Sequence, residues 1–182
     1  MAIKDKQWKR LSSEVGPDLK LFRARWDEML NPRNEKSHKM IILQSKDAVN
    51  VVAISPQRTM IFVRQYRFGI EDFTLELPGG LLNHDEDVVP AAKRELREET
   101  GYGSDSWEEL GKIASNPVFM DSYIYHYLAE NAEAKFDLAP DEGEDVEIVE
   151  IPIEEVKKML YSGAFLHPHT VSALNLYFAR QT

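Results

Sequence analysis

The sequence contains no cysteine. This absence excludes disulfide bonds, thiolate metal sites and cysteine nucleophiles. The sequence also lacks a run of about twenty apolar residues, so no membrane span is predicted. The first residues, MAIKDKQWKRLSSE, are not followed by the apolar segment of a secretory signal. We therefore expect a soluble protein, with the cytoplasm as its default location.

Basic residues are in deficit. The chain has 22 lysines and arginines against 31 aspartates and glutamates, a formal net charge of −9. This balance argues against a protein that wraps nucleic acid, which needs a basic face. It also disfavours an anionic substrate, unless bound divalent cations supply positive charge locally.

The apolar content is sufficient for a globular protein. At 182 residues and 43% apolar residues, the chain suits one domain, or one domain with a smaller appendage. Strand-like runs surround one central helical segment, and further helical segments follow, which favours an α+β fold with a mixed sheet. The expected strands are residues 19–26, 38–44, 48–54, 60–66, 73–80, 106–114, 121–130 and 148–152. The expected helices are residues 91–100, 153–163 and 170–180.

The most informative segment is GLLNHDEDVVPAAKRELREETGY, residues 80–102. Residues 91–100 are rich in strong helix formers and contain no glycine or proline, which predicts a helix. On a helix, Glu95 lies three residues from Glu98 and four from Glu99. The three carboxylates therefore share one side of the helix.

Carboxylates at these spacings repel one another, and only Arg94 and Arg97 are interleaved with them. Divalent cations between the carboxylates would remove the repulsion, and an all-oxygen ligand set selects hard ions such as Mg²⁺ or Mn²⁺. The alternative interpretation is a charged helix that faces solvent.

The spacing resembles the Nudix box, G-x5-E-x7-R-E-U-x-E-E-x-G-U, where U is a bulky aliphatic residue. The matching residues are Gly80, Glu86, Arg94, Glu95, Leu96, Glu98, Glu99 and Gly101. Only the last position departs, because Tyr102 stands where an aliphatic residue is usual, and that position packs rather than reacts. Chance would produce the seven fixed charged or glycine positions on the order of once in a million such chains.

This resemblance implies a Nudix α/β/α sandwich over residues 46–182 and hydrolysis of a diphosphate bond with Mg²⁺ or Mn²⁺. The implied metal ligands are Glu95, Glu98, Glu99 and the backbone carbonyl of Gly79. Glu86 is expected to pair with Arg94 and to hold the loop that begins at Gly80 against the helix. Arg94 and Glu98 are expected to belong to the catalytic group.

Other segments resemble the ADP-ribose pyrophosphatase and nucleoside-diphosphate-sugar hydrolase branch. These are VRQYR (63–67), LELPGG (75–80), Pro117 and the C-terminal MLYSGAFLHPHTVSALNLYFA. The branch implies that residues 1–45 form a β-rich unit that builds a homodimer and contributes to the nucleotide site. The expected substrate is a nucleotide sugar, with ADP-ribose as the leading candidate.

The general base of that branch lies on an acidic loop before the last strand. The matching run here is residues 140–146, PDEGEDV. The resemblance places Glu142 at the base position and Glu144 at a further metal-ligand position. The alternative interpretation is a solvated acidic loop.

Substrate contacts are expected from residues of both parts of the chain. Arg67 is the candidate for the diphosphate, because the donors of a guanidinium match phosphate oxygens. The remaining candidates are Trp8, Phe22 and Trp26, which could stack on a base, and Asn116, Pro117 and Met120. The alternatives are a surface arginine, core aromatic residues and an ordinary loop proline.

Other functions stay open at this stage. GDP-mannose or a dinucleotide such as NADH would keep the chemistry and change the substrate, although no cysteine is available for a zinc motif. A nucleotide-sugar sensor without turnover would usually have lost glutamates of the box, and all are present here. An acidic protein-interaction module would need no metal.

Overall fold

The computed structural model describes residues 7–139 and 145–181, and these residues form two compact units. The N-terminal unit comprises the described residues up to Lys46 together with Ala114–Tyr123. The main unit comprises Asp47–Ile113 and the described residues from Ile124 onward. The segment Ala114–Tyr123 thus groups with the N-terminal residues, although it lies outside the expected 1–45 unit.

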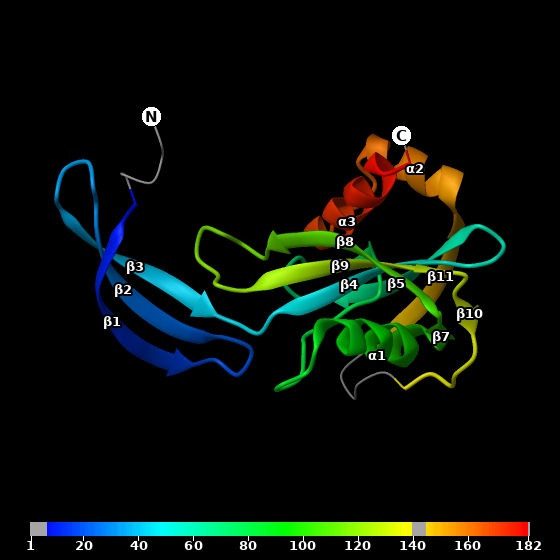
Figure 1. Ribbon diagram of the computed structural model, residues 1–182, viewed down its shortest axis with the longest axis horizontal. Coiled ribbons are helices and arrows are strands. Elements are labelled where there is room, and N and C mark those ends of the chain that lie inside the picture. The colour runs from blue at the N-terminus through cyan, green and yellow to red at the C-terminus, as the bar shows by residue number, and fades with distance from the viewer. Residues whose placement is uncertain (1–6, 140–144, 182) are drawn as a thin grey trace. The chain divides into compact units, whose positions relative to one another are not determined.

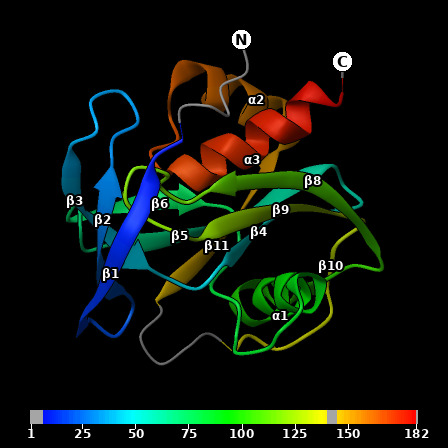
Figure 2. The same cartoon turned by 60° about the vertical axis from the view of Figure 1, so that its left-hand side comes forward.

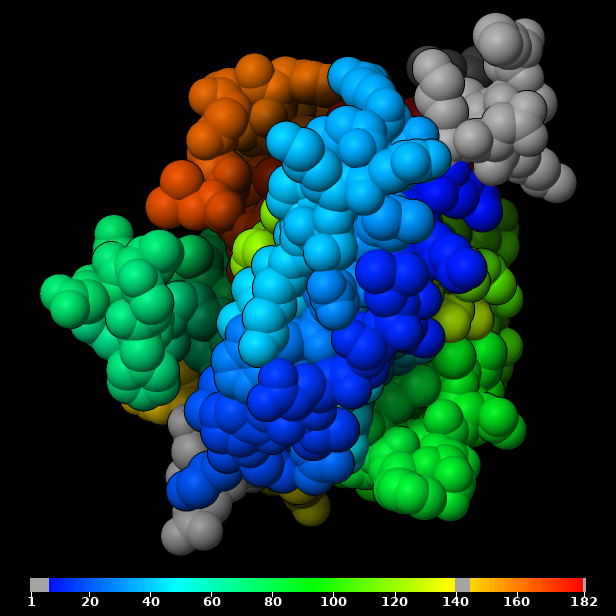
Figure 3. All heavy atoms as spheres, turned by 90° about the vertical axis from the view of Figure 1, so that its left-hand side faces the viewer, coloured from blue at the N-terminus to red at the C-terminus, as the bar shows by residue number. Residues whose placement is uncertain are grey.

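The N-terminal unit is an antiparallel sheet of β1 (Lys9–Asp18), β2 (Arg23–Leu30) and β3 (Ser37–Gln44) in that order. Its strands lie side by side and present one continuous face (Figure 3). The strand expected over residues 19–26 is wrong in its first half. The Asp18 carboxylate accepts a hydrogen bond from the Lys20 amide at 2.9 Å, and Lys20 has a φ of 70°, so the chain turns there.

The main unit is built on a mixed sheet with the strand order β11-β5-β4-β9-β8, to which β6 adds beside β5. Strands β4 and β9 are parallel, whereas β5 pairs antiparallel with β4, β6 and β11. The strands are β4 (Ala48–Ile54), β5 (Thr59–Arg67), β6 (Asp72–Glu76), β8 (Ser106–Ala114), β9 (Tyr123–Glu130) and β11 (Val146–Pro152). A separate small pair consists of β7 (Tyr102–Gly103) and β10 (Glu133–Ala134).

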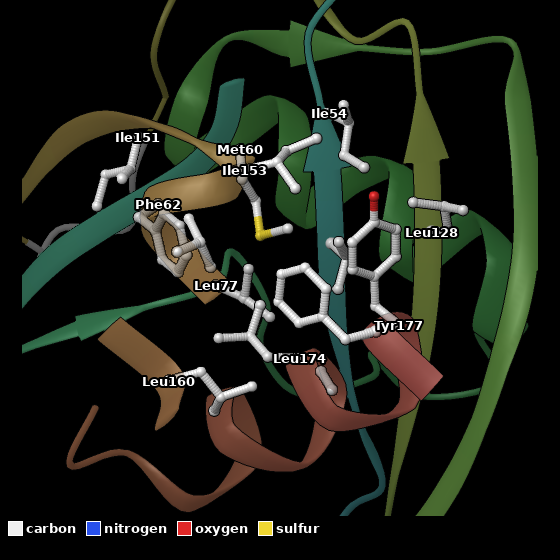
Figure 4. Close-up of a cluster of buried hydrophobic side chains, with 14 of the residues drawn as sticks. Ile54, Met60, Phe62, Leu77, Leu128, Ile151, Ile153, Leu160, Leu174 and Tyr177 are labelled. Atoms are coloured by element: carbon white, nitrogen blue, oxygen red, sulfur yellow. The ribbon is translucent and has the colours of Figure 1, made fainter. Parts of the chain in front are cut away.

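Helices cover both faces of this sheet because the central strands are apolar on both sides (Figures 1 and 2). Met60 and Phe62 of β5 face α2 (Ile153–Ser162) and α3 (Pro168–Ala179), whose Leu160, Leu174 and Tyr177 point toward them (Figure 4). Alternate residues point to the opposite face, where α1 (Val88–Thr100) packs. The expected α+β sandwich with a mixed sheet is confirmed.

Helix α1 begins three residues earlier than expected, at Val88. Asp87 occupies the N-cap position, although its side chain makes no capping hydrogen bond. Pro90 lies in the first turn, where its missing N–H costs no helical hydrogen bond. In the described part of the chain, every helix is too short or too polar to cross a bilayer.

One core histidine makes stability depend on pH. His126 of β9 is fully buried, and its Nε2 lies 3.1 Å from Ser172 Oγ. Burial lowers the pKa of His126 to about 4 from its ordinary 6.5. Between these values the unfolded chain binds the proton that the folded chain excludes, so the free energy of unfolding falls as the pH drops from about 6.5 to about 4.

We expect His126→Gln to remove this contribution. Between about pH 7.5 and about pH 5, the variant should lose about 2 kcal/mol less unfolding free energy than the wild type. Urea titrations at both pH values measure the difference. His84→Gln is the control, because the His84 side chain is 89% exposed. Equal pH dependence in wild type and His126→Gln would contradict the assignment.

Candidate active site

The loop after β6 is held against β4 by backbone hydrogen bonds. The amide of Val51 donates to the Pro78 carbonyl at 2.8 Å, and the amide of Val49 donates to the Gly80 carbonyl at 2.9 Å. The buried Asn50 side chain donates to the Leu77 carbonyl at 3.2 Å. These bonds fix the path of the chain from the sheet to α1.

Two glycines in this loop allow its close approach to its neighbours. A Cβ atom on Gly79 would lie 2.2 Å from the Val49 carbonyl oxygen, which is closer than real Cβ contacts. A Cβ atom on Gly80 would lie 2.6 Å from Glu95 Oε1. The Gly79 amide also donates to Glu99 Oε2 at 2.9 Å. The loop therefore lies directly on two of the predicted metal-binding glutamates.

Arg94 connects the loop with the acidic side of α1. Its Nε and Nη2 donate to the two carboxylate oxygens of Glu86, both at 2.9 Å. Its Nη1 donates to Glu95 Oε1 at 2.8 Å and to Glu98 Oε2 at 3.0 Å. Its Nη2 also donates to the Leu81 carbonyl at 3.2 Å. The paired geometry with Glu86 is the contact expected from the sequence.

These contacts shift the protonation equilibria of both partners. The hydrogen bonds from Arg94 and the backbone hydrogen bond from Asn83 lower the pKa of Glu86 to about 2, against the opposing effect of desolvation. The same hydrogen bond to Glu86, followed by those to Glu98 and Glu95, raises the pKa of Arg94. Glu86 is therefore a carboxylate, and Arg94 a cation, throughout the physiological range.

The three box glutamates differ in exposure. The Glu95 and Glu98 side chains are 11% and 26% exposed, and Glu99 is buried. Within the described residues, no group of three or more acidic or histidine side chains forms a ready metal site. The oxygen-only donor set suits a hard divalent ion. Because Arg94 bridges Glu95 and Glu98, metal binding there requires these contacts to rearrange.

A second charged cluster surrounds Glu76, which is 2% exposed on β6. Arg67 Nε and Nη2 each donate to one of its oxygens at 2.6 Å, the Thr74 hydroxyl also donates to it, and His167 Nε2 lies 3.4 Å away. Burial alone would raise the pKa of Glu76, but these neighbours lower it. Arg67 is thus held by a buried carboxylate, and its role in diphosphate binding stays a prediction.

Sequence reasoning missed Glu76. The alternation in FTLE indicates it, because this pattern places Thr74 and Glu76 on one side of the strand and Phe73 and Leu75 on the other. A carboxylate at such a buried position requires a partner. Arg67 of β5 pairs with Asp72 of β6, so its side chain lies on the same side of the sheet as Glu76. Arg67 is therefore close enough to be the partner of Glu76.

The remaining predicted substrate residues lie in the N-terminal unit. Trp8 lines a cavity of about 340 Å³ with Asn31, Pro32 and Arg33. Lys39 Nζ lies 5.4 Å from the centre of the Trp26 ring. Asn116, Pro117 and Met120 share one turn, in which the Met120 amide donates to the Asn116 carbonyl at 2.8 Å. Their contacts with substrate stay predictions, and Glu142 and Glu144 lie outside the described residues.

Comparisons with known proteins agree with this architecture. The NUDIX domain family matches residues 44–172. The chain is 34% identical over 142 residues to a methanol dehydrogenase activator of Bacillus methanolicus, covering 78% of this chain and 77% of that protein. It is 33% identical over 144 residues to an ADP-ribose pyrophosphatase of Bacillus subtilis (strain 168), with the same coverage of each.

One solved structure is similar to this protein over nearly the whole chain. The crystal structure of an ADP compounds hydrolase matches with a TM-score of 0.84 and 26% identity, covering 96% of this chain and 94% of that one. The chain belongs to the Nudix family.

Proposed function

We propose that this protein hydrolyses the diphosphate bond of nucleoside-diphosphate sugars, with ADP-ribose as the leading substrate. The products would be a nucleoside monophosphate and a sugar phosphate. The main support is the arrangement of the complete box. Arg94 donates hydrogen bonds to Glu86, Glu95 and Glu98, and the loop before the helix donates one to Glu99 through the Gly79 amide. The relatives named ADP-ribose pyrophosphatase and ADP compounds hydrolase support the substrate class.

Nudix enzymes generally need divalent ions, and Mg²⁺ or Mn²⁺ is the proposed cofactor. Glu95, Glu98 and Glu99 would hold the ion with the Gly79 carbonyl, and a bound ion supplies charge neutralisation and acidifies water. Glu86 orients Arg94 through a charge-assisted bidentate contact and takes no part in proton transfer. The Gly79 amide fixes one oxygen of Glu99, so that the carboxylate is oriented before any ion arrives.

A substrate panel tests the proposal. Purified protein with Mg²⁺ is incubated with ADP-ribose, GDP-mannose, UDP-glucose, NADH and 8-oxo-dGTP, and release of monophosphate is measured. We expect ADP-ribose to be cleaved fastest. A preference for GDP-mannose or NADH would change the substrate and keep the chemistry. If the protein binds a nucleotide sugar but cleaves no compound of the panel, it is a sensor and the proposed hydrolase activity is refuted.

We also propose Glu142 as the general base and Glu144 as a further metal ligand, on the resemblance of their loop to that of the ADP-ribose branch. Glu142→Gln should lower the turnover number by about a hundredfold or more while metal affinity is kept, because general bases contribute about that much. Single-turnover rates and Mn²⁺ titration measure the two quantities. An unchanged turnover number would show that Glu142 is not the general base, and Glu144 would be the next candidate.

We further propose that the protein is a cytoplasmic homodimer. Apolar side chains on one face of the N-terminal sheet are exposed, among them Val15 and Met40. A second copy of the chain covering this face would bury them. We expect sedimentation velocity to show a species of twice the 20.9 kDa chain mass, and Val15→Glu to shift it toward the monomer. Leu166→Glu, at an exposed leucine of the main unit, is the control. A monomeric wild type would contradict the dimer.

A further inference from the structure

A cavity of about 460 Å³ lies beside α1 in the main unit. Its walls come from α1, from residues 103–107, which lead from β7 into β8, and from the residues after β10, the strand that pairs with β7 (Figure 1). Charged and aromatic side chains line it, among them Lys93, Arg97, Trp107, Lys135 and Phe136. The volume lies within the range of sites for small ligands.

This cavity lies on the opposite side of α1 from Glu95. A helix turns about 100° per residue, so Lys93 and Arg97 lie about 160–200° around the axis from Glu95. Glu95 is buried, whereas Lys93 and Arg97 are exposed. Arg94 lies between the two sides and lines the cavity while it contacts Glu98. The cavity and the proposed metal site therefore lie on different sides of one helix, with Arg94 between them.

The lining is positively charged in a protein whose net charge is −9. Lys93, Arg97 and Lys135 contribute three cations in addition to Arg94, and Asp105 contributes one acid. Lys135 pairs with Glu133 at 3.0 Å. With other described residues, neither Lys93 nor Arg97 forms an ion pair. Two cations four residues apart on one helix side can together bind a phosphate group.

Two aromatic rings form the apolar part of the wall. The Trp107 indole is held by a hydrogen bond from its Nε1 to the Ser104 carbonyl at 2.8 Å. Phe136 is 50% exposed and packs on Gly103, where an added Cβ atom would lie 2.7 Å from the ring. Lys93 Nζ lies 5.8 Å from the Trp107 ring centre, and Arg97 Cζ lies 5.7 Å from that of Phe136. Each aromatic surface is thus next to a cation.

We propose that this cavity binds a nucleoside monophosphate on the side of α1 opposite Glu95. The base would stack on Trp107 or Phe136, since every nucleobase presents a π-face to such rings. Lys93 and Arg97 would bind the phosphate through charge-assisted hydrogen bonds. Asp105 would accept hydrogen bonds from sugar hydroxyl groups.

Titration with AMP, followed by NMR of the tryptophan indole N–H groups, tests the proposal. Excess EDTA keeps divalent ions out of the experiment, so neither hydrolysis nor metal binding contributes. Trp107 reports on the cavity, whereas Trp8 and Trp26 report on the N-terminal unit. Trp→Phe variants assign the three signals. Adenosine, ribose 5-phosphate and inorganic phosphate are the comparison probes.

We expect AMP to shift the Trp107 signal saturably, with adenosine and inorganic phosphate each binding at least about tenfold more weakly. Lys93→Gln and Arg97→Gln should each weaken AMP binding about tenfold. Lys157→Gln is the matched control, because Lys157 also lies 5.8 Å from an aromatic ring, that of Phe178 on α3. Gly103→Ala should weaken binding by displacing the Phe136 ring.

Three results would overturn the proposal. The first is the absence of a saturable Trp107 shift with AMP. The second is equal AMP affinity in the wild type and in both Lys93→Gln and Arg97→Gln. The third is equal binding of inorganic phosphate and AMP, which would show an anion patch without a base site. A failed substrate panel would leave this binding test unaffected.

Discussion

Glu98→Gln is expected to reduce hydrolysis of ADP-ribose by about a thousandfold while the protein stays folded. The amide cannot supply the negative charge that a divalent ion requires, and such an ion contributes several kcal/mol to the reaction barrier. The side chain is partly exposed, and its contact with Arg94 Nη1 at 3.0 Å is one of several made by that guanidinium. Steady-state rates with Mg²⁺ and a thermal unfolding curve measure the two effects.

Two further variants show whether the effect is specific. Glu147→Gln is the matched control, because Glu147 also accepts a hydrogen bond from an arginine, Arg64, at 3.0 Å. It should keep the wild-type rate. Glu86→Gln should reduce the rate by about ten- to a hundredfold, since Glu86 orients Arg94 and is not a proposed ligand. A rate in Glu98→Gln equal to that of Glu147→Gln would refute the role of Glu98.

Gly79→Ala is expected to destabilise the protein and abolish activity together. Its Cβ atom would lie 2.2 Å from the Val49 carbonyl oxygen and 2.9 Å from Asn50 Cα. Both are backbone atoms of the central strand β4 and cannot yield as a side chain would. The loop must move instead, which breaks the hydrogen bond from the Gly79 amide to Glu99. We expect a loss of about 2–3 kcal/mol, typical of overpacking.

Urea unfolding of Gly79→Ala and Gly69→Ala measures this loss against a matched glycine. A Cβ atom on Gly69 would meet no described heavy atom within 4 Å, so Gly69→Ala should keep wild-type stability and rate. Equal stability of the two variants would show that the loop does not lie as closely on β4 as the structure places it.

Local sequence patterns predicted the layered part of the fold well. The apolar runs at 48–54 and 60–66 correspond to β4 and β5, since strands covered on both faces are continuously apolar. By contrast, β1 was missed because its residues KRLSSEVGPD are mostly polar and exposed. Its place depends on pairing with β2, a non-local contact that local propensity does not encode.

The site was predictable to the extent that it depends on spacing along one helix. The pairing of Glu86 with Arg94 followed from the family resemblance, and the structure has this contact. The additional contacts of Arg94 with Glu95 and Glu98 depend on side-chain rotamers, which sequence spacing alone does not specify. The same holds for the pairing of Arg67 with Glu76, which joins two strands of a hairpin.

Anomalous diffraction from a crystal soaked in Mn²⁺ tests the role of the glutamates most directly. We expect an anomalous peak bounded by the carboxylates of Glu95, Glu98 and Glu99 and by the Gly79 carbonyl, with Arg94 withdrawn from at least one carboxylate. Ordered Mn²⁺ elsewhere in the crystal, with Arg94 still bridging Glu95 and Glu98, would contradict this role of the glutamates.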